Sequence, residues 1–87
     1  MGGLKKFLVG KVVHYYPKIG VAVVELSGEL KVGDSVSFEG ASTNFSQTIS
    51  SMQVEHEKID SAASGQAIGL KLEERARAGD SVYKIME

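Results

Sequence analysis

The sequence contains no cysteine and no tryptophan, and its single proline is Pro17. Without cysteine the chain can form neither a disulfide nor a thiolate metal site. No apolar run approaches the roughly 20 residues that a membrane-spanning helix requires, and Phe7-Leu8-Val9 is too short for the core of a signal peptide. Hydrophobic residues make up 43% and charged residues 24% of the chain, as in ordinary globular domains. We therefore expect a cytoplasmic protein without membrane association.

Motifs for catalysis and cofactor binding are also missing. Gly10-Lys11 resembles the end of a phosphate-binding loop, but Lys5 stands where the first glycine would be and Val12 where Ser or Thr would bind magnesium. The two histidines, His14 and His56, have no second ligand at zinc-site spacing. No serine pairs with a histidine and a carboxylate at a recognisable spacing. The sequence thus predicts a non-enzymatic protein with no catalytic residues, no cofactor and no metal.

Two segments are nearly identical, residues 31–38 and 77–84, which share Gly-Asp-Ser-Val in register. Glycine tolerates a positive φ and aspartate can bond nearby backbone, so each segment predicts a tight turn. The alternating residues that follow each turn are typical of a half-buried strand. We interpret the two segments as structurally equivalent corners of one small β-barrel.

The remaining pattern predicts six strands, no long helix and a single domain over residues 7–86, preceded by a flexible N-terminus over residues 1–6. The expected strands are residues 7–16, 21–26, 35–39, 45–55, 67–72 and 82–86.

Four segments of the sequence predict local structural features. Residues 21–26 are apolar at both alternating positions, which indicates a strand covered on both faces. In residues 35–39, Val36 and Phe38 should point inward and the serines outward. A change of pattern within 45–55 predicts a β-bulge near Ser50-Ser51. Residues 60–65 predict one helical turn.

The first 20 residues contain four lysines and no acidic residue, although the net charge of the chain is −1. Cations bind phosphates and aromatic rings stack on bases, so this region is a candidate RNA-binding surface. Its predicted residues are Lys5, Lys6, Lys11, His14, Tyr15, Tyr16 and Lys18. The alternative is that the lysines are solvated and the tyrosines pack at the end of a strand.

Four segments in order resemble the second domain of translational GTPases of the elongation factor Tu type. They are residues 28–36 with the first Gly-Asp corner, 49–56, 62–72 and 77–82 with the second corner. The resemblance covers about Val9 to Ile85 and implies an all-β fold, a small six-stranded closed Greek-key barrel of the translation-protein second-domain type. It also implies a translation-factor-like module, lacking a GTPase domain, that binds tRNA, ribosomal RNA or a ribonucleoprotein of the translation machinery.

In that family the barrel contributes to holding the aminoacylated end of tRNA. The matching positions here are Gln53, Glu55 and Ala67. The family's tRNA carriers often have an acidic residue in place of Gln53 and an asparagine in place of Ala67.

Residues 10–26 are also similar to the small C-terminal barrel of collagenase-like peptidases, an accessory module in those enzymes. This second resemblance implies the alternative function, a protein–protein docking module for a separate enzyme or factor. A third alternative is a binder of carbohydrate or another small ligand, although barrels of this size are usually filled by their own side chains.

Overall fold

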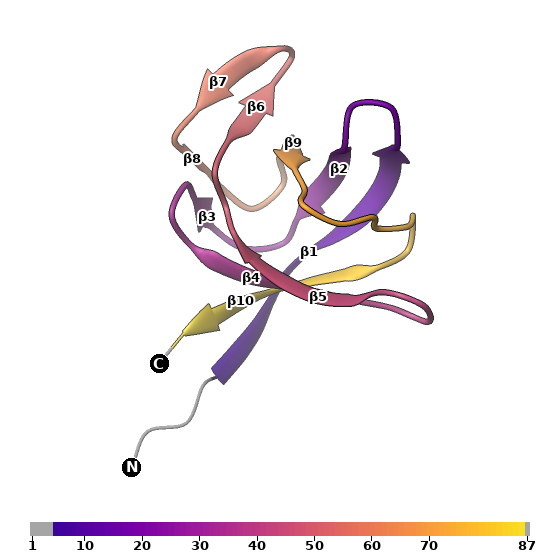
Figure 1. The fold of residues 1–87 in the computed structure, drawn as a ribbon. Helices are drawn as coiled ribbons and strands as arrows, with labels where there is room; N and C mark the ends of the chain where they lie inside the picture. The colour runs from indigo at the N-terminus through magenta and orange to yellow at the C-terminus, as the bar shows by residue number, and fades with distance from the viewer. Residues whose placement is uncertain (1–4, 87) are drawn as a thin grey trace.

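Strand β1, Lys5–Tyr16, is the longest element of the computed structural model, which describes residues 5–86 (Figure 1). Its first part pairs with β10 (Ser81–Met86) and its second part with β2 (Val21–Leu26), both antiparallel. One curved strand therefore joins the two parts of the sheet.

Gly10 is the residue at which β1 changes partner, because it pairs with both Val82 and Leu26. A Cβ at Gly10 would lie 2.7 Å from Cγ1 of Val24 and 2.9 Å from the carbonyl oxygen of Glu25. A glycine without a side chain permits this close approach of two strands. Register shifts on either side of it show where the strand bends.

The other strands of residues 5–86 are short. They are β3 (Leu30–Lys31), β4 (Ser35–Glu39), β5 (Asn44–Thr48), β6 (Met52–Val54), β7 (Glu57–Ile59), β8 (Ser61–Ala62) and β9 (Ala67–Lys71).

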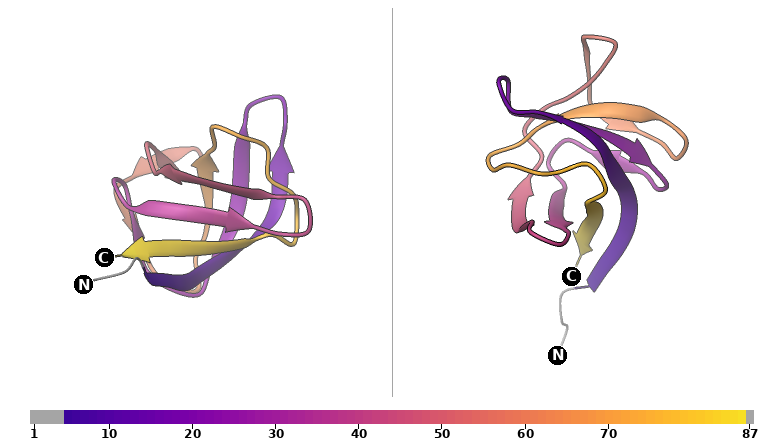
Figure 2. Two further views of the ribbon diagram at one scale, coloured as in Figure 1. Left: turned by 60° about the horizontal axis from the view of Figure 1, so that its bottom comes forward. Right: turned by 90° about the vertical axis from the view of Figure 1, so that its right-hand side faces the viewer.

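Eight strands form one antiparallel sheet in the order β5-β4-β10-β1-β2-β9-β6-β7, and β3 pairs with β8 separately. The sheet folds over, so that β5, β4 and β10 cross β2 and β9 at a steep angle (Figure 2). The all-β class is confirmed. The hydrogen-bonded order ends at β5 and β7, and ten strands are present in the described residues, so a closed six-stranded barrel is not confirmed.

The side chain of Gln47 links the β5 end of the sheet to the end of β9. Its Nε2 donates to the carbonyl oxygen of Lys71 at 3.0 Å, and the amide of Glu73 donates to its Oε1 at 2.8 Å. Gln47 is buried, which makes this bridge an internal one.

The two Gly-Asp corners have the same geometry, as expected. Gly33 and Gly79 have φ values of 96° and 97°. Their amides donate to the carbonyl oxygens of Ile49 and Val12, at 2.9 and 2.7 Å. The strands that follow the corners, β4 and β10, pair with each other. The repeated tetrapeptide therefore builds two equivalent turns in one sheet.

The core lies inside the folded sheet and is built by alternate residues of its strands. In β9, Ile68 and Leu70 are buried while Lys71 is exposed, as predicted. Phe38 and Phe45 stack with ring centroids 4.9 Å apart. Residues 5–86 contain no helix with the length and hydropathy to cross a membrane.

Two predicted elements differ from the structure. Residues 45–55 form β5 and β6, separated at 49–51, rather than one bulged strand. The separation has a tertiary cause, because the amide of Ile49 donates to the carbonyl oxygen of Asp34 in the first corner. Residues 60–65 do not form a helical turn, since Ala62 in β8 pairs with Leu30 in β3.

One smaller expectation also needs correction. Ser37 was expected outside but is buried, and its Oγ donates to Oε2 of Glu39 at 2.9 Å. Of the predicted flexible N-terminus, residues 1–4 lie outside the described residues. Lys5 and Lys6, in contrast, are the first residues of β1.

Candidate functional site

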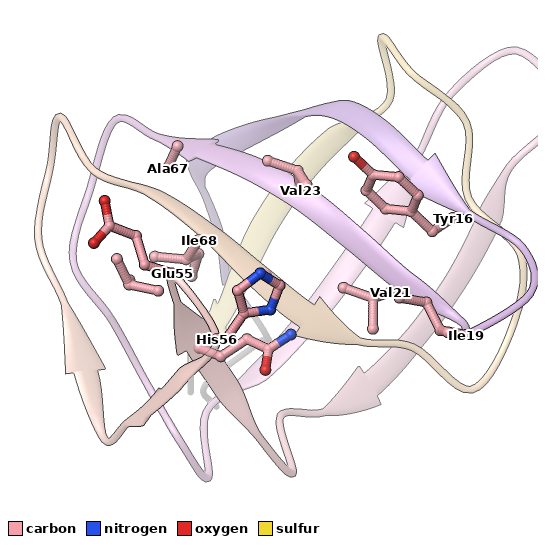
Figure 3. Close-up of a pocket in the computed structure, with 11 residues that line it drawn as sticks. Tyr16, Ile19, Val21, Val23, Glu55, His56, Ala67 and Ile68 are labelled. Carbon is pink, nitrogen blue, oxygen red and sulfur yellow. The ribbon is translucent and has the colours of Figure 1, made fainter.

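A cavity of about 460 Å³ opens on the outer face of the sheet, between the β1–β2 and β6–β7 hairpins (Figure 3). The β1–β2 side contributes Tyr16, Ile19, Val21 and Val23, and the β6–β7 side contributes residues 53–56. The floor is residues 67–69 of β9. The lining is mainly apolar with a few polar groups, the usual character of a ligand-binding cavity.

The residues of strand β2 that point away from the core line the cavity. Ala22 and Val24 are buried in the core, whereas Val21 and Val23 are half-buried and line the cavity. The prediction that β2 is covered on both faces is therefore wrong. Its outer apolar residues form one wall of the cavity.

The floor of the cavity includes residues with small side chains or none, which leaves room above β9. Gly69 pairs with Val23 on one side and with Gln53 on the other. A Cβ at this position would meet Cγ of Gln53 at 3.2 Å and Cγ1 of Val21 at 3.4 Å. The missing side chain of Gly69 therefore leaves space between the two hairpins.

The turn between β6 and β7 is conformationally unusual. Its central residues, Glu55 and His56, have φ values of 50° and 69°. Two-residue hairpin turns with positive φ at both positions favour Asn-Gly and similar pairs, and a non-glycine residue in this region costs about 1–3 kcal/mol. Both side chains lie at the cavity (Figure 3).

One end of the cavity is acidic. The Glu55 carboxylate lies at the end marked by Ala67 (Figure 3), and Ala67 pairs across the sheet with Glu25. Within residues 5–86, neither glutamate takes part in an ion pair. At the opposite end, Nζ of Lys71 donates to the carbonyl oxygen of Ile19 and is thereby held at the hairpin.

The structure brings Gln53, Glu55 and Ala67 together around this cavity, and Tyr16 joins them from β1. Their grouping follows from the pairing of β6, β9 and β2. Sequence reasoning missed the apolar wall and His56. The apolar residues at both alternating positions of β2 were the available signal.

The predicted lysines are spread along β1 and the turn after it. Strand β1 extends for up to roughly 35 Å at ~3.3 Å per residue, with Lys5 at its start, Lys11 near its middle and Lys18 in the turn that follows it. Lys6 Nζ bonds to Oε2 of Glu39 at 2.6 Å. This bond, followed by the one from Ser37, holds the pKa of the Glu39 carboxyl below its usual value.

His14 and Tyr15 line a separate, more open hollow of about 360 Å³. Arg75 and Arg77 also line this hollow, and the sequence analysis missed both because they are some 60 positions away. The ring of His14 also contacts Tyr16 edge to face, with centroids 4.3 Å apart. The predicted RNA-binding set is thus divided among several places.

Comparison with known proteins shows what this fold resembles. No family model matches the sequence. An uncharacterized protease of Methanocaldococcus jannaschii is 37% identical over 84 residues, which are 95% of this chain and 21% of that protein. A collagenase of Porphyromonas gingivalis is 33% identical over 82 residues, 92% of this chain and 20% of that protein. The chain therefore spans about a fifth of the length of these relatives.

Two crystal structures show the C-terminal domain of a Geobacillus thermoleovorans protein assigned to the U32 peptidases. One matches with a TM-score of 0.84 and 28% identity, covering 88% of this chain and 90% of that domain. The other, a selenomethionine variant, matches with a TM-score of 0.83 and 26% identity, covering 87% and 96%. The chain is similar to the C-terminal domains of U32 peptidases.

This similarity corrects the predicted function. The predicted similarity to the C-terminal domains of collagenase-like peptidases is confirmed. Homology to the second domain of elongation factor Tu is not shown. The prediction of a translation-factor-like, RNA-binding module with tRNA or ribosomal RNA as partner is wrong, because the similar proteins are peptidases and their C-terminal domains. The docking-module alternative fits these findings better.

Proposed function

We propose that the chain is a cytoplasmic, non-catalytic docking module for a protein of the U32 peptidase type, and that it docks through the cavity. The similarity to C-terminal domains of U32 peptidases carries the proposal. The similar protease and collagenase are about five times longer than the part that matches this chain, so most of their sequence is outside the shared part.

The chemistry of the cavity supports docking rather than catalysis. None of the described residues that line it is a serine, threonine or cysteine, so it offers no hydroxyl or thiol nucleophile apart from the Tyr16 phenol. Tyr16 and Ile19 are exposed, 47% and 55%, beside the half-buried Val21 and Val23. Burying such side chains favours docking by about 25 cal/mol per Å² of apolar surface before the entropic costs of association are subtracted. Tyrosine is also enriched among the residues that dominate binding energy at interfaces.

The test is affinity capture from a lysate of the host, with and without ribonuclease, followed by mass spectrometry directed at U32-type peptidases. We expect a U32-type peptidase to be enriched equally in both samples. Failure to enrich one would contradict the proposal.

Two variants place the contact surface. Val23→Lys introduces a charge into the cavity wall and should abolish capture, because an unpaired ammonium group would be buried on docking. Val32→Lys is the matched control, since Val32 is exposed on the first corner, outside the cavity. Equal capture by both variants would show that another surface makes the contact. Circular dichroism and thermal unfolding confirm that each variant is folded.

A further inference from the structure

We propose that the cavity binds a basic side chain, preferably arginine, presented by a segment of the partner protein. The aliphatic part of that side chain lies along the apolar wall and floor, and its guanidinium group reaches the Glu55 carboxylate at the acidic end. This inference rests on the proposed function only in taking the occupant to be part of a protein.

The shape of the cavity suits a long, unbranched stem. Val21 and Val23 form an apolar wall, and Gly69 and Ala67 give a floor without large side chains. Arginine and lysine side chains bury their methylene groups against such surfaces while their charged ends stay in a polar environment. A volume of about 460 Å³ is within the range of cavities that hold a ligand group.

Charge selects the end group of the occupant. Glu55 is the one carboxylate among the described residues that line the cavity, and none of those residues forms an ion pair with it. A cation beside this carboxylate favours its charged form and is attracted to it. An acidic occupant would be repelled at this end.

The nearby cations leave the acidic end available. Lys58 pairs opposite Gln53, but it is not among the residues that line the cavity. Lys11 pairs opposite Glu25, and both of these residues line a different hollow. Lys71 donates to the carbonyl oxygen of Ile19 at the other end. His56 and Tyr16 are the other titratable residues of the lining, and His56 lies over the middle of the cavity (Figure 3).

The strained turn supports a binding role for Glu55. A left-handed conformation at two successive non-glycine residues persists only where the surroundings hold it in place, and such residues cluster at ligand sites. The turn fixes the direction in which the Glu55 side chain leaves the backbone before any ligand arrives, which lowers the ordering cost of binding.

Arginine fits better than lysine for two reasons. Its planar guanidinium can donate two parallel hydrogen bonds to one carboxylate, and it is less strongly hydrated than an ammonium group. Its transfer to a partly apolar cavity is therefore easier.

The experiment is an NMR titration of the ¹⁵N-labelled 87-residue chain with N-acetyl-arginine methylamide. N-acetyl-norleucine methylamide, which has a similar stem and no charge, is the matched probe. We expect the arginine probe to shift the amide signals of Val23, Glu55, Ala67 and Gly69, and to bind more tightly than the norleucine probe. Higher salt should weaken only the arginine probe, because salt screens exposed charges.

Two variants test the role of charge. Glu55→Gln should weaken the arginine probe roughly two- to fivefold, as for an exposed ion pair, and leave the norleucine probe unchanged. Glu74→Gln removes an exposed carboxylate outside the cavity and should change neither. Equal binding of both probes, or no shift of the cavity amides, would overturn the proposal. This titration uses the chain alone, so its failure would leave the capture of a peptidase as a separate question.

Discussion

Asp34 and Asp80 occupy equivalent positions in the two corners of the sheet. Each carboxylate accepts a hydrogen bond from the amide three residues earlier, Lys31 at 2.9 Å and Arg77 at 2.7 Å. Their surroundings differ, because Asp80 is only 4% exposed, whereas Asp34 is partly exposed and lies 3.3 Å from Nζ of Lys84. The repeated turn therefore has one buried copy and one copy near the surface.

Alanine at these two positions should have unequal effects. Asp80→Ala leaves the amide of Arg77 without its partner in a buried corner, and we expect the free energy of unfolding to fall by about 2 kcal/mol. Asp34→Ala should cost about 1 kcal/mol, since water can replace the lost carboxylate there. Urea unfolding of both variants measures the difference. A larger loss for Asp34→Ala would contradict the assignment of the buried corner.

Gly10, the residue at which β1 changes partner, should not tolerate a side chain. Gly10→Ala places a methyl group against Val24 and the carbonyl oxygen of Glu25, so we expect a loss of about 2 kcal/mol from overpacking. Gly69→Ala is the comparison, because its new methyl group meets the flexible side chain of Gln53 at a longer distance. Thermal unfolding should show a clearly lower Tm for Gly10→Ala than for Gly69→Ala. Similar Tm values would contradict the close approach at Gly10.

The bridge made by Gln47 should contribute to stability. Gln47→Met keeps a side chain of similar length but leaves the carbonyl oxygen of Lys71 and the amide of Glu73 unpaired, at an expected cost of about 2 kcal/mol. The exposed neighbour Ser46 provides the control, and Ser46→Ala should stay within about 0.5 kcal/mol of the original protein. Hydrogen exchange of the Glu73 amide should also become faster in Gln47→Met, and unchanged exchange would argue against the bridge.

The strained turn should be relieved by glycine. His56→Gly removes the steric cost of a left-handed backbone, and after the added flexibility of the unfolded chain we expect a net gain of about 0.5–1 kcal/mol. Ser64→Gly, in a turn where φ is not positive, should instead destabilise the protein. Both free energies come from denaturant unfolding. A loss of stability in His56→Gly would mean that its side chain outweighs the backbone strain.

The Glu39 carboxyl should titrate at a lower pH in the folded chain than in the unfolded chain, chiefly because Lys6 Nζ bonds to it. A depressed folded pKa adds stability above the unfolded pKa, and this contribution disappears as the pH falls through the folded pKa. Lys6→Met should therefore raise the pKa of Glu39 toward its ordinary value and weaken the loss of stability in acid. NMR titration of the Glu39 side-chain carbon measures the shift. An unchanged pKa would assign the effect to Ser37 alone.

The local sequence pattern was enough to predict several elements of the fold correctly. Residues 35–39 form β4 with the predicted bounds, and the alternation in residues 67–72 matches the burial of β9 and Leu72. Both depend on the period of two along a strand, which neighbouring residues reveal. The burial of Ser37 could not be read in this way, because it depends on what packs above it.

The candidate site required the three-dimensional structure. Tyr16, Glu55 and Ala67 come from distant parts of the chain and meet only through strand pairing. The RNA-binding prediction is wrong because the similar proteins are peptidases and their C-terminal domains. Lysines that are close in sequence are spread along an extended strand.

The sequence by itself determined the all-β class and the two Gly-Asp corners, because strand alternation and a positive φ at glycine are local steric effects. Only the tertiary structure decided where β1 changes partner and where residues 45–55 break. It also decided that the outer face of β2 forms the wall of a cavity. These features depend on pairing between segments far apart in the chain, and their register and close approaches are set by packing across the whole sheet.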